Sequence, residues 1–238
     1  MSEQFEVERK YALDKSDLAR VRKRLTEQGF VFVGTRHQQD HFVPGTRKHE
    51  LLRVRREGTQ HFALTFKERI VINGEKTRRE SEPEIHPIAA HLIVEAASRE
   101  LRAPLPTLYK KRRDFKRAWD GFVAHVVLDY VPELGELFSS YFMEVEIIVE
   151  DAGEVARAKK LVKKIAERLL GEKRKRNKLS YRRMLFKTLK ARERFPKRWS
   201  RLTGKKKGRL DPRDTGAVGY LQTGKKVKQP KMSRKKVA

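Results

Sequence analysis

One pattern constrains the fold more than any other: short segments in which charged side chains alternate with apolar ones. Residues 5–11 read FEVERKY, and because successive side chains of a strand point to opposite faces, Glu6, Glu8 and Lys10 share one face. The apolar side chains take the other face. The alternation recurs along the first 150 residues, in segments bounded by Gly, Pro or polar clusters. It predicts a mostly antiparallel β domain whose strands are apolar on one side and charged on the other.

The same spacing gives the order of the expected elements. Strands are expected at about eight places: 4–11, 30–43, 51–57, 61–69, 76–86, 107–118, 122–131 and 141–150. Helices are expected between Asp14 and Gly29, over 87–101, over 155–170 and over about 177–190, where apolar residues recur with a helical period. The combination predicts an α+β fold.

The last fifth of the chain differs in composition from the rest. The 238 residues include 58 Lys+Arg and 31 Asp+Glu, a net charge of +27, and residues 191–238 hold 17 of these bases but only 3 of the acids, a net +14. Their apolar side chains are too few to offset the entropy of ordering, so we expect a domain over 1–190 followed by a disordered basic tail over 191–238. The tail either solubilises the protein or attaches it to nucleic acid or polyphosphate.

Composition also excludes several classes of protein. There is no cysteine, which rules out disulfides, zinc–thiolate sites, iron–sulfur clusters and thiol catalysis. No apolar run reaches the roughly 18 residues of a membrane-spanning helix. Glu3, Glu6 and Glu8 lie near the start of the chain, where a signal or transit peptide would be free of acidic residues. We therefore expect a cytoplasmic protein without membrane contact.

Two architectures fit strands of this kind: a sheet whose charged face meets water, or a closed barrel with its charges in the lumen and helices packed outside. The charge chemistry favours the barrel. Two strands carry closely spaced glutamate pairs, Glu6/Glu8 and Glu144/Glu146, whose oxygens suit Mg²⁺ or Mn²⁺. Other strands carry paired Arg and Lys, which a bound polyphosphate requires. The pattern indicates a metal-plus-phosphate site.

These residues, in this order, resemble a known family. Glu6-x-Glu8-x-Lys10 is similar to the ExExK signature of the CYTH family, the triphosphate tunnel metalloenzymes. The later members of the ordered set are Leu52-Arg53-Val54-Arg55, Leu64-Thr65-Phe66-Lys67, Arg78-x-Glu80-x-Glu82, Lys111-x-Arg113, Leu128-Asp129 and Glu144-x-Glu146. Ser180-Tyr181 also resembles a feature of the family's closing helix. The resemblance covers about residues 4–150.

What the resemblance implies is an eight-stranded antiparallel tunnel that binds a triphosphate and one or two divalent cations. The expected phosphate-binding residues are Arg53, Arg55, Lys67, Arg78, Lys111 and Arg113. The expected ligands of Mg²⁺ or Mn²⁺ are Glu6, Glu8, Glu144, Glu146 and Asp129, with Glu80 or Glu82 as further candidates. Lys10 and Lys67 are the candidate catalytic residues, and Lys10 is suited either to binding phosphate or to tuning a metal ligand.

The function that follows from the resemblance is metal-dependent hydrolysis of an inorganic or organic triphosphate. Such a reaction requires mainly in-line positioning and charge neutralisation, which the paired acids and bases would provide. Two alternatives remain. A class IV adenylyl cyclase would use the same cradle on ATP, and a non-catalytic module would hold polyphosphate or nucleic acid without turnover. The glutamate pairs argue against the second alternative, since an anion-binding site gains nothing from carboxylates.

Overall fold

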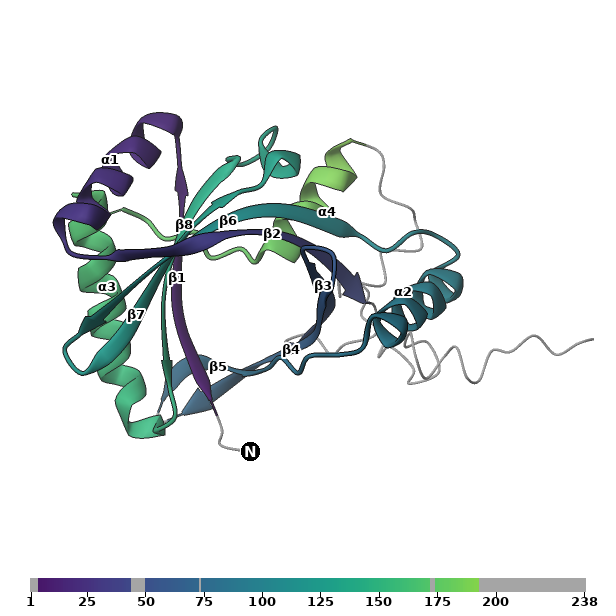
Figure 1. The fold of residues 1–238 in the computed structure, drawn as a ribbon, viewed down its shortest axis with the longest axis horizontal. Helices are drawn as coiled ribbons and strands as arrows, with labels where there is room; N and C mark the ends of the chain where they lie inside the picture. Colours follow the sequence, from purple (N-terminus) through teal and green to yellow (C-terminus); the bar gives the residue numbers. More distant parts are fainter. Residues whose placement is uncertain (1–3, 44–49, 73, 172–173, 193–238) are drawn as a thin grey trace, which may run out of the picture.

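A closed barrel of antiparallel strands forms the centre of the computed structural model, which describes residues 4–43, 50–72, 74–171 and 174–192 (Figure 1). The strands within these residues are β1 (Phe5–Leu13), β2 (Val31–Val43), β3 (Glu50–Glu57), β4 (His61–Ile72), β5 (Glu75–Ser81), β6 (Thr107–Trp119), β7 (Phe122–Tyr130) and β8 (Tyr141–Val149). Their order around the barrel is β1, β5, β4, β3, β2, β6, β7 and β8, and β8 pairs with β1 to close it. The predicted barrel is confirmed.

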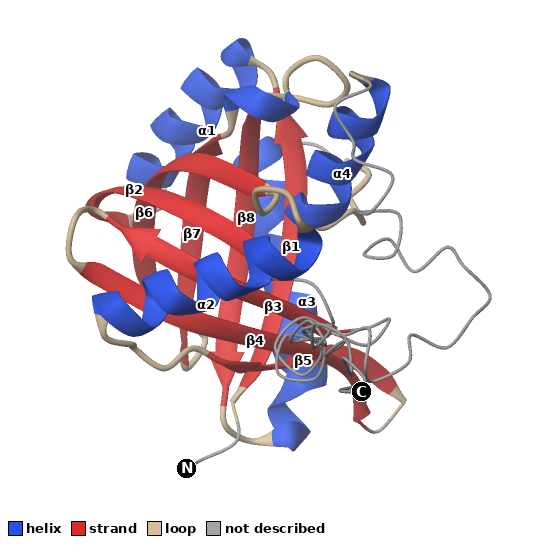
Figure 2. Cartoon of the chain, turned by 90° about the vertical axis from the view of Figure 1, so that its right-hand side faces the viewer, coloured by secondary structure: helices blue, strands red, loops and turns tan. Residues whose placement is uncertain are grey.

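Helices connect the strands and pack outside the barrel (Figures 1 and 2). They are α1 (Lys15–Glu27), α2 (Pro87–Leu101), α3 (Val155–Leu170) and α4 (Tyr181–Ala191), with short 3₁₀ turns η1 (Pro132–Leu134) and η2 (Ala152–Glu154). Asp14 caps α1 as expected, because its side chain accepts from the Asp17 amide while the Asp17 carboxylate accepts from the Asp14 amide. None of the described helices has both the length and the apolar character needed to cross a membrane.

Two element boundaries differ from the sequence expectation. β5 ends at Ser81 instead of reaching residue 86, and Pro83, two residues later, has no amide hydrogen to donate. The last helix begins at Tyr181 instead of 177, because the Ser180 side chain accepts from the Arg183 amide and fixes the helix start there. Residues 193–238, nearly all of the expected disordered tail, lie outside the described residues.

The outer, apolar faces of the strands form two cores beneath the helices. The larger core joins α1 and α3 to β1, β7 and β8; its buried members include Val7, Val126, Val145, Val162 and Ile165. The second joins α2 to β2 and β3, where Val54 packs with Ala90 and Ala97. Because the apolar side chains point outward here, the charged side chains of the same strands point into the barrel.

A third core closes one end of the tunnel. Phe42, Leu108 and Phe142 are each two positions from a buried charged residue on the same strand face. All three pack against Tyr181 and Met184 of α4. The tunnel face of β2, β6 and β8 therefore changes from charged to apolar where α4 covers it.

Candidate active site in the tunnel

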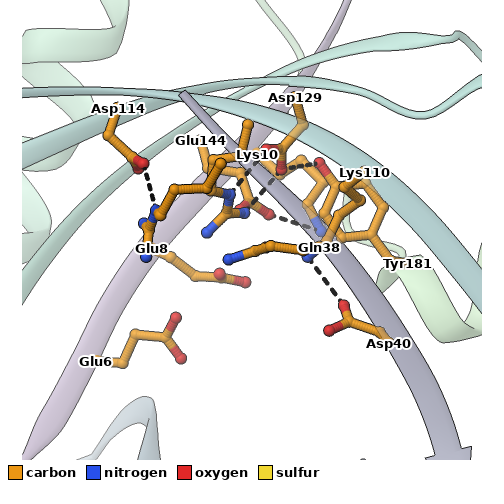
Figure 3. A network of polar contacts seen from close by, with 12 residues as sticks. Glu6, Glu8, Lys10, Gln38, Asp40, Lys110, Asp114, Asp129, Glu144 and Tyr181 are labelled. Carbon is orange, nitrogen blue, oxygen red and sulfur yellow. Dashed lines mark hydrogen bonds and ion pairs between the residues drawn. The ribbon is translucent and has the colours of Figure 1, made fainter. Parts of the chain in front are cut away.

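Four glutamates on two neighbouring strands form one side of the tunnel, here called the acidic wall: Glu6 and Glu8 of β1, and Glu144 and Glu146 of β8. The barrel closes between these strands, so that Glu8 lies directly opposite Glu146 and Lys10 directly opposite Glu144. Glu6 and Glu144 are buried. Figure 3 shows Glu6 and Glu8 pointing from β1 into the same space as Glu144 and Lys10. Strands from the two ends of the fold thus supply a single set of carboxylates.

Two glutamates of the acidic wall hold protons more tightly than usual. Burial raises the pKa of Glu146 to about 8, with the neighbouring Glu6 and Glu8 adding to the effect. Burial and the charge of Glu6 likewise raise the pKa of Glu8. Carboxylates facing each other across a strand pair repel when ionised. Around Glu8 and Glu146, the acidic wall therefore has more negative charge than its surroundings neutralise.

Two cations of the neighbouring strands partly balance this wall. The Lys67 Nζ lies 2.8 Å from Glu6 Oε2 and 2.7 Å from Glu80 Oε2, and these carboxylates raise the pKa of Lys67 against the effect of burial. Arg78 donates to Glu8, which is the main reason why its own pKa is raised. Lys67 and Arg78 therefore stay charged next to the glutamates.

The donor set of the acidic wall fits a hard divalent cation, because crowded carboxylate oxygens with raised pKa gain most from added positive charge. Glu6, Glu8 and Glu146 are the residues that could hold it. Within the described residues, however, no three acidic or histidine side chains are already arranged as a metal site. A bound cation would have to draw these carboxylates together.

The opposite side of the tunnel, here called the basic wall, consists of Arg53 and Arg55 of β3 and Lys110 and Arg112 of β6. Three of these four converge on one buried carboxylate of β2, Asp40. Arg53 Nη1, Arg55 Nε and Lys110 Nζ lie 3.2, 2.8 and 2.9 Å from its oxygens. The three cations hold the pKa of Asp40 well below its usual range despite its burial. Glu82 also accepts from Arg53 and Arg55, so these three cations share two carboxylates and the wall keeps a small positive excess.

Lys110 differs from the other cations of the basic wall. Burial lowers its pKa to about 7, and the charges of Arg55 and Arg112 act in the same direction, although Asp40 opposes them. Its side chain is almost inaccessible to solvent. At neutral pH a substantial fraction of Lys110 is therefore uncharged and able to accept a proton.

The expected orientation of β6 is wrong. Lys111 and Arg113 were expected to face the tunnel, but Lys111 is exposed and the Arg113 guanidinium lies 5.1 Å from the Phe32 ring on the outside of the barrel. The reason lies downstream, since Phe115 packs into the outer core and residues 111 and 113 share its face. Lys110 and Arg112 face the tunnel in their place.

Asp129 and Glu144, two of the expected metal ligands, are engaged by cations. Arg112 donates to Asp129 Oδ1 and Oδ2 at 2.8 and 2.7 Å, and to Glu144 Oε2 at 2.8 Å. Lys10 Nζ lies 2.9 Å from Glu144 Oε1. These contacts lower the pKa of Glu144 and link the acidic wall to the basic wall.

Comparison with known proteins gives this tunnel its family. The model of the CYTH domain matches residues 4–180, about three quarters of the chain. The chain belongs to the CYTH family. No curated protein matches it in sequence.

Solved structures share the CYTH fold of this chain. PH1819 of Pyrococcus horikoshii OT3 is 24% identical with a TM-score of 0.56, and the match covers 76% of this chain and 98% of that one. PH1012 of the same organism is 22% identical with a TM-score of 0.55, covering 74% and 96%. A candidate adenylate cyclase from Vibrio parahaemolyticus is 19% identical with a TM-score of 0.56, covering 76% and 98%. These identities show a common fold.

In this CYTH domain, α4 contributes an aromatic floor to the tunnel. The Tyr181 hydroxyl donates to Asp129 Oδ2 at 2.8 Å, and Lys10 Nζ lies 3.6 Å from the centre of its ring (Figure 3). Burial, together with Asp129, raises the pKa of Tyr181 well above its usual value. Tyr181 therefore stays protonated and fixes Asp129, the main partner of Arg112.

Several tunnel residues of this CYTH domain were not singled out from the sequence. They are Gln38, Asp40, Lys110, Arg112 and Asp114. Lys110 and Arg112 lie within the run Tyr109–Asp114, in which five successive residues are charged, so alternation alone does not assign a face. The one available signal was Phe115, whose apolar side chain marks the outer face of that strand.

Proposed function

We propose that the tunnel binds an inorganic or organic triphosphate together with a divalent cation and hydrolyses a terminal phosphoanhydride bond. The observation that carries this proposal is the opposition of the two walls: glutamates with raised pKa values face cations that outnumber the carboxylates they share. A metal-bound polyphosphate would bring a cation to the acidic wall and an anion to the basic wall. Members of the CYTH family are usually enzymes and in general depend on metal, which supports a catalytic reading.

The basic wall would hold the phosphate oxygens. Arg53 and Arg55 are nearly buried, and the Arg53 Nε finds no hydrogen-bond acceptor within the described residues. An unused buried donor costs free energy that a phosphate oxygen would recover. Glu82, which accepts from both arginines, keeps their forks aligned. The two arginines thus present a fixed, anion-ready surface.

On the acidic wall, Glu6, Glu8 and Glu146 would hold the cation. When bound, Mg²⁺ or Mn²⁺ neutralises charge on the phosphate oxygens. Lys67 and Arg78 stay protonated beside these glutamates and would contact the phosphate from the same side. Glu146 would lose its extra proton as the cation replaces the repulsion of its neighbours.

Lys110 would take the proton of the attacking water. Its pKa of about 7 would let it accept a proton near neutral pH, and its neighbours Asp40, Arg55 and Arg112 belong to the side of the tunnel proposed to hold the phosphate. Lys67, a candidate catalytic residue from the sequence, instead has a raised pKa and suits charge neutralisation. Lys10 lies between Glu144 and the Tyr181 ring and would position Glu144.

An assay with several substrates tests the proposal. Purified protein receives tripolyphosphate, thiamine triphosphate, ATP or GTP with Mg²⁺ or Mn²⁺, and both free phosphate and cyclic nucleotide are measured. We expect phosphate release that requires the metal, is lost in Glu8→Gln and is kept in Glu150→Gln, a matched change at an exposed residue just after β8. Cyclic nucleotide as the main product would instead assign a cyclase, and absence of turnover with every substrate would contradict catalysis.

A further inference from the structure

Part of the barrel wall, on β2 and β6, is not used by the tunnel site, and none of the described helices covers it. In Figure 1 the two strands cross the upper part of the molecule, with α1 near one end and α2 and α4 near the other. Several large side chains on the outer face of these strands are exposed to solvent: Tyr109 is 54% exposed, Phe32 47% and Tyr130 of the adjoining β7 40%. This surface contains Lys111 and Arg113, which the tunnel site leaves unexplained.

The strand pairing fixes how these side chains are arranged. On β6, Tyr109, Lys111 and Arg113 follow one another at every second position of the outer face. Across β2 they pair with Gln39, His37 and Thr35, and on the other side Lys111 pairs with Tyr130. Tyr109 and Tyr130 are thus diagonal neighbours, a relation in which residues are typically about 7–8 Å apart. We call this surface the β2–β6 platform; its members are Phe32, His37, Tyr109, Lys111, Arg113 and Tyr130.

The platform carries positive charge from Lys111 and Arg113, and one acid lies at its Tyr109 end, where Glu133 accepts from the Tyr109 backbone amide. None of the paired outer positions just named is an acid. Arg22 of α1 lies close enough to Arg113 that its pKa is lowered, by burial first and by that guanidinium second. Two cations that disfavour each other's charge gain free energy when an anion binds between them. The end of the platform at Arg113 therefore favours binding of a polyanion.

The aromatic side chains add a second preference. Exposed tyrosine rings next to lysine and arginine on a sheet surface provide stacking surfaces for bases and contacts for the phosphates between them. The Tyr109 hydroxyl accepts from the Gln39 amide at 2.9 Å, which holds this ring against β2. Tyr130 packs against Tyr141 with ring centres 5.1 Å apart. Both rings are thus held in place before any ligand binds, which lowers the entropic cost of stacking.

We propose that the β2–β6 platform binds single-stranded nucleic acid, with bases stacked on Tyr109 and Tyr130 and phosphates held by Lys111 and Arg113. Inorganic polyphosphate has charge but no bases, so it would gain nothing from the tyrosines. A duplex hides its base faces and would bind more weakly. The platform lies outside the tunnel, so this proposal stands or fails independently of triphosphate hydrolysis.

Fluorescence anisotropy with the full chain tests the platform, using a labelled single-stranded RNA of about 12 nucleotides. Tyr109→Ala should weaken binding by about tenfold, whereas Tyr109→Phe, which keeps the stacking ring and loses only its hydrogen bond to Gln39, should weaken binding much less. Lys111→Gln should weaken binding a few-fold and reduce the salt dependence by about one phosphate contact, with Lys164→Gln of α3 as the matched control. Triphosphate hydrolysis should be unchanged in all four variants.

Four results would overturn the proposal for the platform. The first is wild-type RNA affinity in the double variant Tyr109→Ala with Tyr130→Ala. The second is an equal loss in Lys111→Gln and Lys164→Gln, which would mean that charge alone determines binding. The third is a dimer in sedimentation that Tyr109→Ala dissociates, which would assign this face to a second copy of the chain. A loss of polyphosphate binding as large as the loss of RNA binding in Tyr109→Ala would likewise exclude base stacking.

Discussion

The two walls of the tunnel handle buried charge in opposite ways. On the basic wall, Asp40 is fully ionised and shared by Arg53, Arg55 and Lys110, so the carboxylate is satisfied and the cations are in excess. On the acidic wall, burial raises the pKa values of Glu8 and Glu146, and the charge of Glu6 adds to the effect at both. The acidic wall thus carries an excess of negative charge around Glu8 and Glu146, and the basic wall a small excess of positive charge.

This difference shows why the walls are not joined into simple ion pairs across the tunnel. Direct pairing occurs mainly at the end covered by α4, where Arg112 contacts both Asp129 and Glu144. Farther from α4, Glu8 and Glu146 lie across the barrel from Arg53 and Arg55, since β1 and β8 are the strands most distant from β2 and β3 in the barrel order. A ligand with both charges is needed to satisfy them.

The largest expected effect is on Lys110. Lys110→Gln should lower kcat by about 10²- to 10⁴-fold, the usual contribution of a general base. Because the deprotonated lysine is the active form and its pKa is about 7, wild-type kcat/KM should rise with pH through about 7. A stopped assay across pH measures both quantities. Lys111→Gln, the neighbour on the outer face, should keep wild-type kcat; a wild-type pH profile in Lys110→Gln would reject this role.

Arg112→Ala should cause the next largest effect, a loss of stability. It leaves Asp129 and Glu144 buried without their main cation, which typically costs about 3–5 kcal/mol of unfolding free energy. Urea denaturation measures this loss. The adjacent Arg113→Ala, on the outer face, should cost about 0.5 kcal/mol. Equal losses for the two variants would mean that the assigned strand face is wrong.

A smaller effect is expected on substrate affinity, to which the basic wall contributes through its arginines. Arg55→Ala should weaken tripolyphosphate binding by about 1.5–3 kcal/mol, the contribution of charge-assisted hydrogen bonds. Calorimetric titration measures it, and Arg56→Ala, one residue along and bonded to the Gly58 carbonyl outside the tunnel, should have little effect. Unchanged affinity in Arg55→Ala would remove the basic wall from substrate binding.

The smallest expected effect concerns Glu146 without metal. Its pKa is raised from 4.5 to about 8, so between these pH values the folded protein binds more protons than the unfolded chain. Its contribution to unfolding free energy is present below pH 4.5 and falls as pH rises to about 8. Glu146→Gln should therefore be more stable than the wild type above pH 8, by on the order of 1–2 kcal/mol. Urea denaturation in a metal chelator tests this, and equal stability of the two proteins above pH 8 would contradict crowding on the acidic wall.

The sequence predicted the architecture because its strands alternate cleanly. In Arg53-Val54-Arg55 a single apolar residue, buried under α2, fixes the face of both arginines. The same holds for Glu144-Val145-Glu146. Residues 110–113 offered no such marker, since every position is charged, and the face was set by Phe115 and by the closure of the barrel.

Other parts of the site depend on contacts distant in sequence. Asp40 lies in a polar stretch of β2, and nothing local indicates that residues from β3 and β6 would converge on it. The lowered pKa of Lys110 arises from burial and from arginines on two strands, so composition and spacing could not show it. Alternation predicted which faces carry charge, whereas the pairing of charges required the folded barrel.

The most direct test of the two-wall account is the affinity for tripolyphosphate with and without divalent metal, measured by calorimetry in the wild type and in Glu8→Gln. The account predicts that Mg²⁺ or Mn²⁺ strengthens binding by at least about tenfold in the wild type, or about 1.4 kcal/mol. In Glu8→Gln this gain should disappear, while binding in a metal chelator should be no weaker than in the wild type, since a repelling carboxylate has been removed. Equal wild-type affinity with metal and with chelator would contradict the account.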